Sequence, residues 1–372
     1  MNSTLNKIKV SSPGRISIIG EHTDYNGGFV LPAAINKEVS AEITLNGHAS
    51  HCNFQALDMN EKAEFDWAVD ASAQTSWQNY LIGVIEELRK RGAELRGVDI
   101  SFSGNVPIGS GMSSSAALEC CIAFGLNELF NLGFDKITLT EIAQKAEHNY
   151  VGTMCGIMDQ FASIMGKEDR VMLLDCRSLE YKYLPLELRD YEILIYNTNV
   201  SHSLSDSGYN TRRQECETGV LVLQKHFPEV ELLRDVTLEM LETVKNELSE
   251  TVYQRCHYVI SENNRVLAAT EALQAGDLEE LGKLMYLSHA GLSKKYEVSC
   301  AELDFLVEQT RDKDYVLGAR MMGGGFGGCT INLIEKSRSK EFVAESSVLY
   351  EGAFGFSPTA FYLSIEGGTG VL

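Results

Sequence analysis

VPIGSGMSSSAA, residues 106–117, joins a predicted strand to a predicted helix, and the rest of the chain is organised around it. Before it, apolar Val98, Ile100 and Phe102 alternate with polar residues, which is the period of a half-buried strand. After it, residues 116–130 form a helix-like run. A strand that turns through glycines and serines into a helix presents backbone N–H groups and a positive dipole end, which suits phosphate.

An ordinary Gly/Ser turn accounts for the same stretch equally well, since small residues also serve simple connections. The stretch does not continue with the Gly-Lys-Ser/Thr of a Walker loop. A nucleotide bound at this loop would therefore belong to a different family of fold.

The length of 372 residues exceeds what one hydrophobic core usually supports, so we expect two domains. The hydrophobic content of 44% is enough to fill both cores. The composition changes near residues 175–189, and we place the boundary there. The prediction is an N-terminal domain over residues 1–180 and a C-terminal domain over residues 181–372, the latter with a glycine-rich hairpin.

The charge balance excludes some classes of partner. Lys and Arg total 32 against 52 Asp and Glu, so the formal net charge is −20. Such a surface repels the phosphate backbone of a nucleic acid and an anionic membrane. A few locally focused cations would still hold an anionic small molecule. We therefore expect small-molecule partners, no nucleic acid and no membrane, and the expected assembly is a monomer.

The nine cysteines indicate a reducing compartment, because they are odd in number and scattered, with no Cys-x-x-Cys pair. The first ten residues lack the apolar core of a signal peptide. No run approaches the roughly 18 apolar residues that a membrane helix needs. The expected location is the cytoplasm.

The densest group of functional residue types follows a short apolar strand at residues 16–19. Glu21, His22 and Asp24 lie within four positions. Carboxylates only accept hydrogen bonds, so they suit a ligand rich in hydroxyl donors and repel phosphate. A sugar fits this loop best. Glu-His-x-Asp also supplies possible metal ligands, and an exposed polar turn is a third interpretation.

Two charged residues lie where a charge is costly. Arg15 stands at the start of the apolar strand, where a guanidinium is partly removed from water and needs an anionic partner. An ordinary ion pair at the surface is the alternative interpretation. Asp159 is the one carboxylate among the small and apolar residues 151–166. It either caps a helix that begins near Gln160 or is paired and acts as a base. Spacing alone leaves both interpretations open.

Two predicted helices carry further candidates. The helix over residues 77–88 has Trp77 and Tyr80 on a broad apolar face, which is core unless its aromatic end forms a slot for a purine base. The helix over residues 139–150 has Glu147 at the edge of its apolar stripe, where a glutamate either binds Mg²⁺ or is solvated. The pattern does not choose between these roles.

The C-terminal half is predicted to consist mostly of helices. A glycine-rich turn over residues 323–328 precedes a strand at residues 330–334, and its glycine density lets backbones approach closely, although a simple turn explains it too. A polar loop is expected over residues 197–207. A strand is predicted over residues 193–195, and helices over residues 209–227, 238–248, 252–275, 278–287 and 301–310.

Three segments in this order resemble the motifs of the GHMP small-molecule kinase family. GRISIIGEHTDYN, residues 14–26, is similar to the signature of the members that phosphorylate galactose, with Ser17 where Asn is usual. Residues 113–117, Ser-Ser-Ser-Ala-Ala, are the second motif, and the glycine turn is the third. Further similarity covers nearly the whole chain, in blocks such as residues 77–80, 156–160, 201–204 and 296–300. Residues 293–295 depart from the family, with Ser-Lys-Lys where Arg-Asp-Asp is common.

The resemblance implies a two-domain α+β GHMP kinase fold. Its N-terminal domain is ribosomal-S5-like α+β and its C-terminal domain is ferredoxin-like α+β, with the site in the cleft between them. It also implies that ATP phosphorylates the anomeric C1 hydroxyl of galactose, which yields galactose 1-phosphate and ADP in the first committed step of galactose catabolism. ATP and Mg²⁺ are the implied cofactors, and galactose and ATP are the implied partners.

The resemblance assigns roles by position. Asp159 matches the catalytic aspartate, and Arg15 matches the arginine that pairs with it and stabilises the transferred phosphoryl group. Whether Asp159 removes the hydroxyl proton or only orients it is open. Ser115 and Glu147 match the pair that coordinates Mg²⁺. The sugar-contacting positions are Glu21, His22, Asp24, Gly156 and Tyr209, and the nucleotide-contacting positions are Gly109, Ser110, Gly111, Met112, Ser113, Ser114, Ser115, Ala116, Trp77 and Tyr80.

Two alternative functions have the same motifs. A kinase for a related sugar, such as N-acetylgalactosamine, galacturonate or arabinose, uses the same chemistry, and the sequence does not show the room beside C2 or C6. A non-catalytic galactose sensor is the alternative from another class. Sensor relatives tend to have lost part of the Ser/Ala run, which is complete at residues 113–117, so a kinase is favoured.

Overall fold

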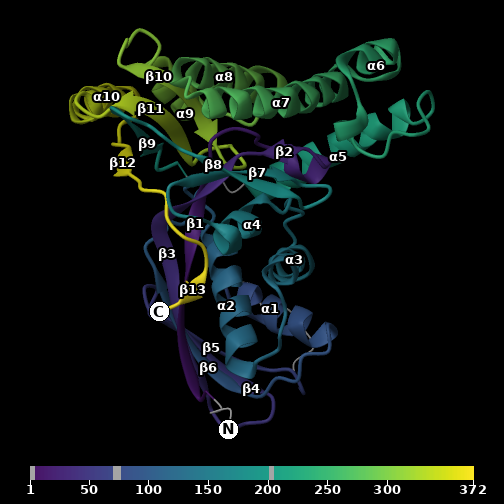
Figure 1. Cartoon of the computed structure of the whole chain (residues 1–372), viewed down its shortest axis with the longest axis vertical. Coiled ribbons are helices and arrows are strands. Elements are labelled where there is room, and N and C mark those ends of the chain that lie inside the picture. Colours follow the sequence, from purple (N-terminus) through teal and green to yellow (C-terminus); the bar gives the residue numbers. More distant parts are fainter. Residues whose placement is uncertain (1–4, 70–76, 201–204) are drawn as a thin grey trace.

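The computed structural model describes residues 5–69, 77–200 and 205–372, which form two α+β parts of an elongated molecule (Figure 1). In this view most of the N-terminal half occupies the lower part and most of the C-terminal half the upper part. The predicted two-domain α+β fold is confirmed. The motif at residues 201–204, and that part of the polar loop expected over residues 197–207, lie outside the described residues.

A six-stranded sheet forms the N-terminal part, in the order β13-β1-β3-β6-β4-β5. Its centre is the long antiparallel pair β1 (Lys7–Ser17) and β3 (Pro32–Leu45). β6 (Val98–Gly104) pairs with β3 and confirms the strand predicted before the glycine loop. The other members are β4 (His51–Ala56), β5 (Glu61–Asp66) and β13 (Gly370–Val371).

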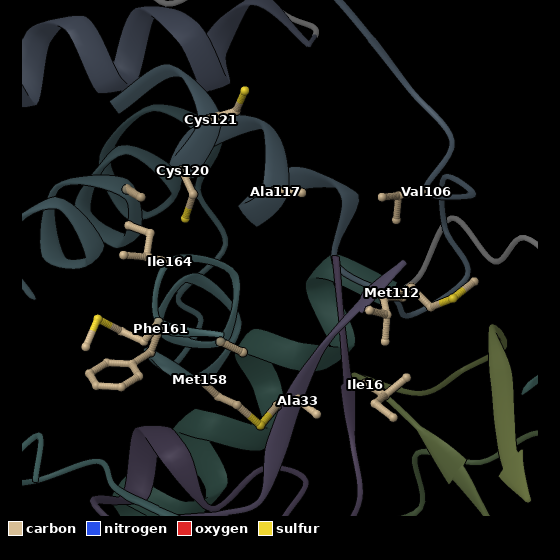
Figure 2. Close-up of a cluster of buried hydrophobic side chains, with 14 of the residues drawn as sticks. Ile16, Ala33, Val106, Met112, Ala117, Cys120, Cys121, Met158, Phe161 and Ile164 are labelled. Atoms are coloured by element: carbon tan, nitrogen blue, oxygen red, sulfur yellow. The ribbon is translucent and has the colours of Figure 1, made fainter. Parts of the chain in front are cut away.

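Helices cover this sheet in two layers. α2 (Ser114–Phe130) and α4 (Met158–Met165) pack on β1 and β3, and α1 (Gln78–Lys90) and α3 (Lys136–Ala146) pack against α2. Small residues allow the close approach: a Cβ on Gly125 would lie 2.6 Å from Ile43 Cδ1. Figure 2 shows part of the resulting core, in which Cys120 of α2 lies on the side of Ile164 of α4, and Met158 of α4 reaches toward Ala33 of β3.

A four-stranded antiparallel sheet forms the C-terminal part, in the order β12-β9-β11-β10. Chain order places helices between β9 (Tyr191–Asn197) and β10 (Val316–Met322), and α10 (Ser339–Phe354) between β11 (Cys329–Glu335) and β12 (Thr359–Tyr362). This is the βαββαβ connectivity of a ferredoxin-like fold. The remaining helices are α5 (Ser205–Leu223), α6 (Leu238–Thr243), α7 (Glu250–Ala275), α8 (Leu278–Gly291) and α9 (Ala301–Glu308).

A small third sheet, β2 (Phe29–Val30), β7 (Arg170–Asp175) and β8 (Tyr181–Pro185), contains the expected domain boundary. Residue 180 falls in the turn between the paired strands β7 and β8. The end of the chain returns to the N-terminal sheet, where Val371 of β13 pairs with Val10 of β1. The division at residue 180 stays a prediction.

The predicted helices are confirmed, with differences at their ends. The helix predicted over residues 238–248 is too long, because α6 stops at Thr243 and a separate 3₁₀ turn follows over Lys245–Glu247. α5 begins at Ser205, four residues before the predicted start. The helix predicted over residues 139–150 is wrong at its end, because α3 stops at Ala146 and a π-helical turn follows over Glu147–Val151. No helix among the described residues is long and apolar enough to cross a membrane.

Candidate active site

A cavity of about 260 Å³ lies where the two parts of the molecule meet. It is bordered by the polar loop after β1, the glycine loop before α2, the segment before α4 and the glycine turn between β10 and β11. Most predicted site residues share its wall. The lining includes Arg15, Glu21, His22, Asp24, Gly109, Ser110, Gly111, Ser113, Ser114, Ser115, Glu147, Gly156, Asp159 and Tyr209.

Arg15 and Asp159 form an ion pair in this wall. Arg15 Nε donates to Asp159 Oδ1 at 2.7 Å and Nη2 donates to Oδ2 at 2.6 Å, which is the bidentate geometry of a guanidinium–carboxylate pair. Burial lowers the pKa of Arg15, but the charges of Asp159 and Glu21 outweigh it and the pKa is raised. Arg15 is 4% exposed, so the surface-pair interpretation is wrong.

Asp159 faces the cavity from the first turn of α4. It does not cap this helix, because Ile157 occupies the N-cap position and Asp159 is already helical. Its side chain is 27% exposed, and Ser113 also donates to Oδ2. The carboxylate is therefore held on one side by Arg15 and Ser113, while the other side remains open to a ligand.

The glycine loop turns through left-handed conformations. Gly109, Gly111 and Ser113 have φ of 72°, 76° and 61°, a region that serine rarely adopts. Ser113 is the N-cap of α2, so the first backbone N–H groups of the helix lie beside the cavity. Met112 and Ala116 are fully buried and are not among the described residues that line the cavity, and the Met112 side chain lies in the core (Figure 2). Their nucleotide contact stays a prediction.

The glycine turn of the C-terminal part lies directly against this loop. A Cβ on Gly111 would be 2.9 Å from Met322 O, and one on Gly323 would be 3.0 Å from Gly111 Cα. The close backbone approach predicted from the glycine density is confirmed. The two loops together form the wall that joins the domains.

The polar loop after β1 is buried. Glu21, His22 and Asp24 are 2%, 3% and 8% exposed, so the exposed-turn interpretation is wrong. No group of three or more His, Cys, Asp or Glu side chains in the described part of the chain is arranged to hold a metal ion. Glu21 instead accepts from Arg320 Nη2 at 2.9 Å and from Gly323 N at 2.8 Å.

Both ring nitrogens of His22 are already bonded within the protein. Nε2 lies 3.2 Å from Gly324 O, so it carries the proton and donates, and Nδ1 accepts from Tyr25 Oη at 2.9 Å. Burial lowers the pKa of His22 to about 3, and the ring is neutral. Tyr209 packs against the same ring with centroids 5.2 Å apart. A direct contact of His22 with a sugar stays a prediction.

Asp24 lies over Gly156. A Cβ on Gly156 would be 1.9 Å from Asp24 Oδ2, so no other residue fits there without displacing the carboxylate. Burial, and then the charge of Asp159, raise the pKa of Asp24 to about 7. The structure thus places a second carboxylate beside Asp159 in the cavity wall.

Ser115 and Glu147 meet at the edge of the cavity. Ser115 Oγ donates to Glu147 Oε1 at 3.4 Å, and Gln160 Nε2 donates to Glu147 Oε2 at 2.8 Å. Burial and the charge of Asp159 raise the pKa of Glu147 to about 7. Gln160 also donates to the fully buried Glu119 at 3.2 Å.

Trp77 and Tyr80 are not among the described residues that line the cavity. Trp77 Nε1 donates to Glu61 Oε2 at 2.6 Å, and its ring packs edge-on against Phe102. Tyr80 packs against the N-terminal core. Their predicted role beside the adenine therefore stays a prediction.

Gln160, Glu119 and Arg320 are site-supporting residues that sequence reasoning missed. Arg320 stands between apolar Ala319 and Met321, and Glu119 follows Leu118 in a continuous apolar run. A charged residue inside such a run is the signal that could have identified both, because full burial of a charge requires a partner. Gln160 carries no comparable signal.

Three family models match the chain. The galactokinase galactose-binding signature matches residues 3–44, the GHMP kinases N terminal domain matches residues 79–167, and the GHMP kinases C terminal model matches residues 269–346. These ranges contain, in order, the polar loop, the glycine loop with Asp159, and the glycine turn.

Relatives match over almost the full chain. A galactokinase of Thermotoga maritima is 44% identical over 364 residues, 98% of this chain and 99% of the relative. A Thermosipho africanus galactokinase is 41% identical over 97% of this chain and 99% of the relative. The crystal structure of Lactococcus lactis galactokinase complexed with galactose matches with a TM-score of 0.94 at 35% identity. The match covers 100% of this chain and 97% of the Lactococcus chain. The Methanococcus jannaschii mevalonate kinase shares the fold, with 17% identity and a TM-score of 0.66. This match covers 98% of this chain and 99% of the mevalonate kinase. The chain belongs to the galactokinase family of the GHMP kinases, which are ATP-dependent enzymes.

Proposed function

We propose that this chain transfers the γ-phosphoryl group of ATP to the anomeric hydroxyl of galactose. The observation that carries the proposal is the Arg15–Asp159 pair, which faces the same cavity as the glycine loop and the carboxylates of Glu21 and Asp24. A helix N-terminus for phosphate, a polar loop for hydroxyls and a paired carboxylate are the parts that phosphoryl transfer to a sugar needs.

Asp159 acts on the attacking hydroxyl in this proposal. The hydroxyl donates to the open side of the carboxylate, which orients the oxygen toward the γ-phosphorus and accepts the proton as the new O–P bond forms. The bond from the γ-phosphorus to the bridging oxygen breaks, and ADP leaves with that oxygen. Arg15 stabilises the negative charge on the phosphoryl oxygens while it holds the carboxylate in place.

The nucleotide phosphates lie over the N-terminus of α2 in this proposal. Its support is that Gly109, Gly111 and Ser113, which have left-handed backbone conformations, line the cavity directly before this N-terminus, where backbone N–H groups are available to an anion. The site compensates locally for a molecule with a net charge of −20, because Arg15 and these N–H dipoles are the groups an anion meets.

Mg²⁺ fits the pair Ser115 and Glu147. Both offer hard oxygen atoms at the edge of the cavity beside the glycine loop, and Mg²⁺ commonly takes one or two protein oxygens and completes its shell with waters and nucleotide phosphates. A bound Mg²⁺ would neutralise phosphate charge. Gln160 and Cys155 hold the second oxygen of Glu147, so Oε1 is the one turned toward Ser115.

Glu147→Gln is expected to raise the Mg²⁺ concentration for half-maximal rate by about tenfold or more, because a neutral amide is a weaker ligand. Since the pKa of Glu147 is about 7, its proton competes with the metal below pH 7. In the natural chain, apparent Mg²⁺ affinity should therefore fall about tenfold per pH unit below that value. Rates measured across Mg²⁺ concentrations at pH 6, 7 and 8 test both statements.

The control for this variant is Glu141→Gln, on the outer side of α3, where Glu141 is 40% exposed and pairs with Arg91. It should leave the Mg²⁺ requirement unchanged. An unchanged Mg²⁺ requirement in Glu147→Gln would contradict the proposed metal site.

The assay for the function incubates the purified chain with Mg-ATP and a panel of sugars: galactose, N-acetylgalactosamine, galacturonate and arabinose. We expect galactose 1-phosphate, identified by NMR, and the highest kcat/KM for galactose. A higher kcat/KM for another sugar would support the related-sugar kinase. Binding of galactose and ATP without any product would support the sensor.

We infer that the protein acts as a monomer in the cytoplasm. The nine cysteines are all unpaired, which supports a reducing compartment. Sedimentation of the purified chain tests the assembly.

A further inference from the structure

Arg320 is the largest fully buried side chain among the described residues. It lies in β10 of the C-terminal part, and its guanidinium reaches into the N-terminal part. Nη2 donates to Ser17 O at 2.7 Å and to Glu21 Oε1 at 2.9 Å, and Nε donates to Ile18 O at 2.9 Å. One side chain thus joins the end of β1, the polar loop that follows it and the strand that leads to the glycine turn.

The carboxylate of Glu21 is bonded through one oxygen. Oε1 accepts from Arg320 Nη2 and from Gly323 N. Among the described residues no donor reaches Oε2, although Glu21 lines the cavity. Oε2 is therefore the oxygen that can accept a hydrogen bond from a ligand hydroxyl.

The geometry requires an arginine. Three of its nitrogen atoms donate in different directions, with Nη1 bonded to Met321 O at 2.7 Å. A lysine ammonium is a point charge on a flexible stem and cannot reproduce this planar fork. Arg320 and Glu21 are 0% and 2% exposed, so both charges are removed from water. Each charge therefore depends on the other to compensate for its burial.

The same contacts extend to the phosphate side of the cavity. Gly323, which donates to Glu21, packs against Gly111. Gly111 O in turn accepts from Arg15 Nη1. Glu21 on the sugar side and Arg15 of the catalytic pair are therefore linked through the backbones of Gly323 and Gly111.

We propose that Arg320 is a positioning residue for the sugar. It holds Oε1 of Glu21 so that Oε2 meets a sugar hydroxyl, and it acts through Glu21 because it is not part of the described cavity lining. This role rests on the proposed function, since the occupant of the cavity is taken to be galactose.

The test measures galactose binding by calorimetry without nucleotide, and kcat and KM for both substrates. Arg320→Lys should weaken galactose binding by about tenfold or more, the usual scale for losing an aligned charged contact, and should raise KM for galactose more than KM for ATP. Arg255→Lys is the matched control. Arg255 is 4% exposed and paired with Glu215 and Glu297 in the C-terminal part, outside the cavity lining. It should lower the thermal midpoint similarly but leave galactose binding unchanged.

A folded Arg320→Lys protein with natural galactose affinity would overturn the positioning role, while the kinase assay on the natural chain would still stand. A natural chain that binds no galactose would contradict the proposed function and this role with it. Equal loss of galactose binding in Arg255→Lys would also overturn the role, because the effect would then be general destabilisation.

A second variant keeps the test decisive if Arg320→Lys does not fold. The double variant Glu21→Gln/Arg320→Gln replaces the charged pair with two neutral amides, which removes the cost of an unpaired buried charge. Its galactose affinity should equal that of Glu21→Gln alone, because Arg320 acts only through Glu21. Further weakening beyond Glu21→Gln, or recovery to the natural affinity, would overturn the proposal.

Discussion

Asp159→Asn is expected to lower kcat by about 10²–10⁴-fold, the range that a positioned acid–base group contributes. Asparagine has nearly the same shape, but it cannot accept the hydroxyl proton and it removes the negative charge beside Arg15. Its amide oxygen still accepts a hydrogen bond from the guanidinium, so the fold and galactose binding should be largely retained. Single-turnover kinetics, calorimetry with galactose and thermal denaturation measure the three quantities.

The control is Asp175→Asn, which removes the negative charge beside Arg234 in another ion pair, at 3.1 Å, outside the cavity lining. It should leave kcat unchanged. If Asp159→Asn instead retained its turnover and lost much of its thermal stability, Asp159 would be a structural partner of Arg15 and the proposed mechanism would be wrong.

The local elements of the site could be predicted from sequence because their signals are local. The alternation of Val98, Ile100 and Phe102 predicts β6, and the glycines and serines after it predict a loop that ends in a helix. The apolar neighbours of Arg15 and Asp159 also indicate that each charge needs a partner. Their pairing across 144 positions does not follow from these neighbours, and it entered only through the family resemblance.

Other features depend on contacts that no local pattern contains. The hydrophobic period of residues 139–150 continues smoothly, so the π-helical turn that follows Ala146 is invisible in it. The pairing of β13 with β1 joins the two ends of the chain. Trp77 is an aromatic residue of the kind that contacts adenine, but its Nε1 donates to Glu61. Glu61 lies in a strand whose position relative to Trp77 the sequence pattern does not predict.

Gly156→Ala should reduce galactose affinity by at least about tenfold, because overpacking at a closed site forces a backbone or side-chain shift. The added Cβ would lie 1.9 Å from Asp24 Oδ2 and 2.0 Å from Asp24 Cγ, and the backbone of Gly156 is not in the left-handed region, so steric overlap with Asp24 is the main effect. The buried carboxylate would have to turn away from its position in the cavity wall. Galactose titration by calorimetry, with KM for ATP measured separately, checks this result.

The matched control is Gly352→Ala on the exposed side of α10, where a Cβ meets nothing within 4 Å. There the substitution should stabilise the protein by up to about 1 kcal/mol, because alanine favours the helix, and should not change either substrate constant. If Gly156→Ala bound galactose as the natural chain does, the position of Asp24 would not matter for the sugar. Burial, and then the charge of Asp159, raise the pKa of Asp24, so a displaced Asp24 should in addition shift the pH profile of kcat. Such a shift separates loss of the carboxylate's position from simple crowding of the cavity.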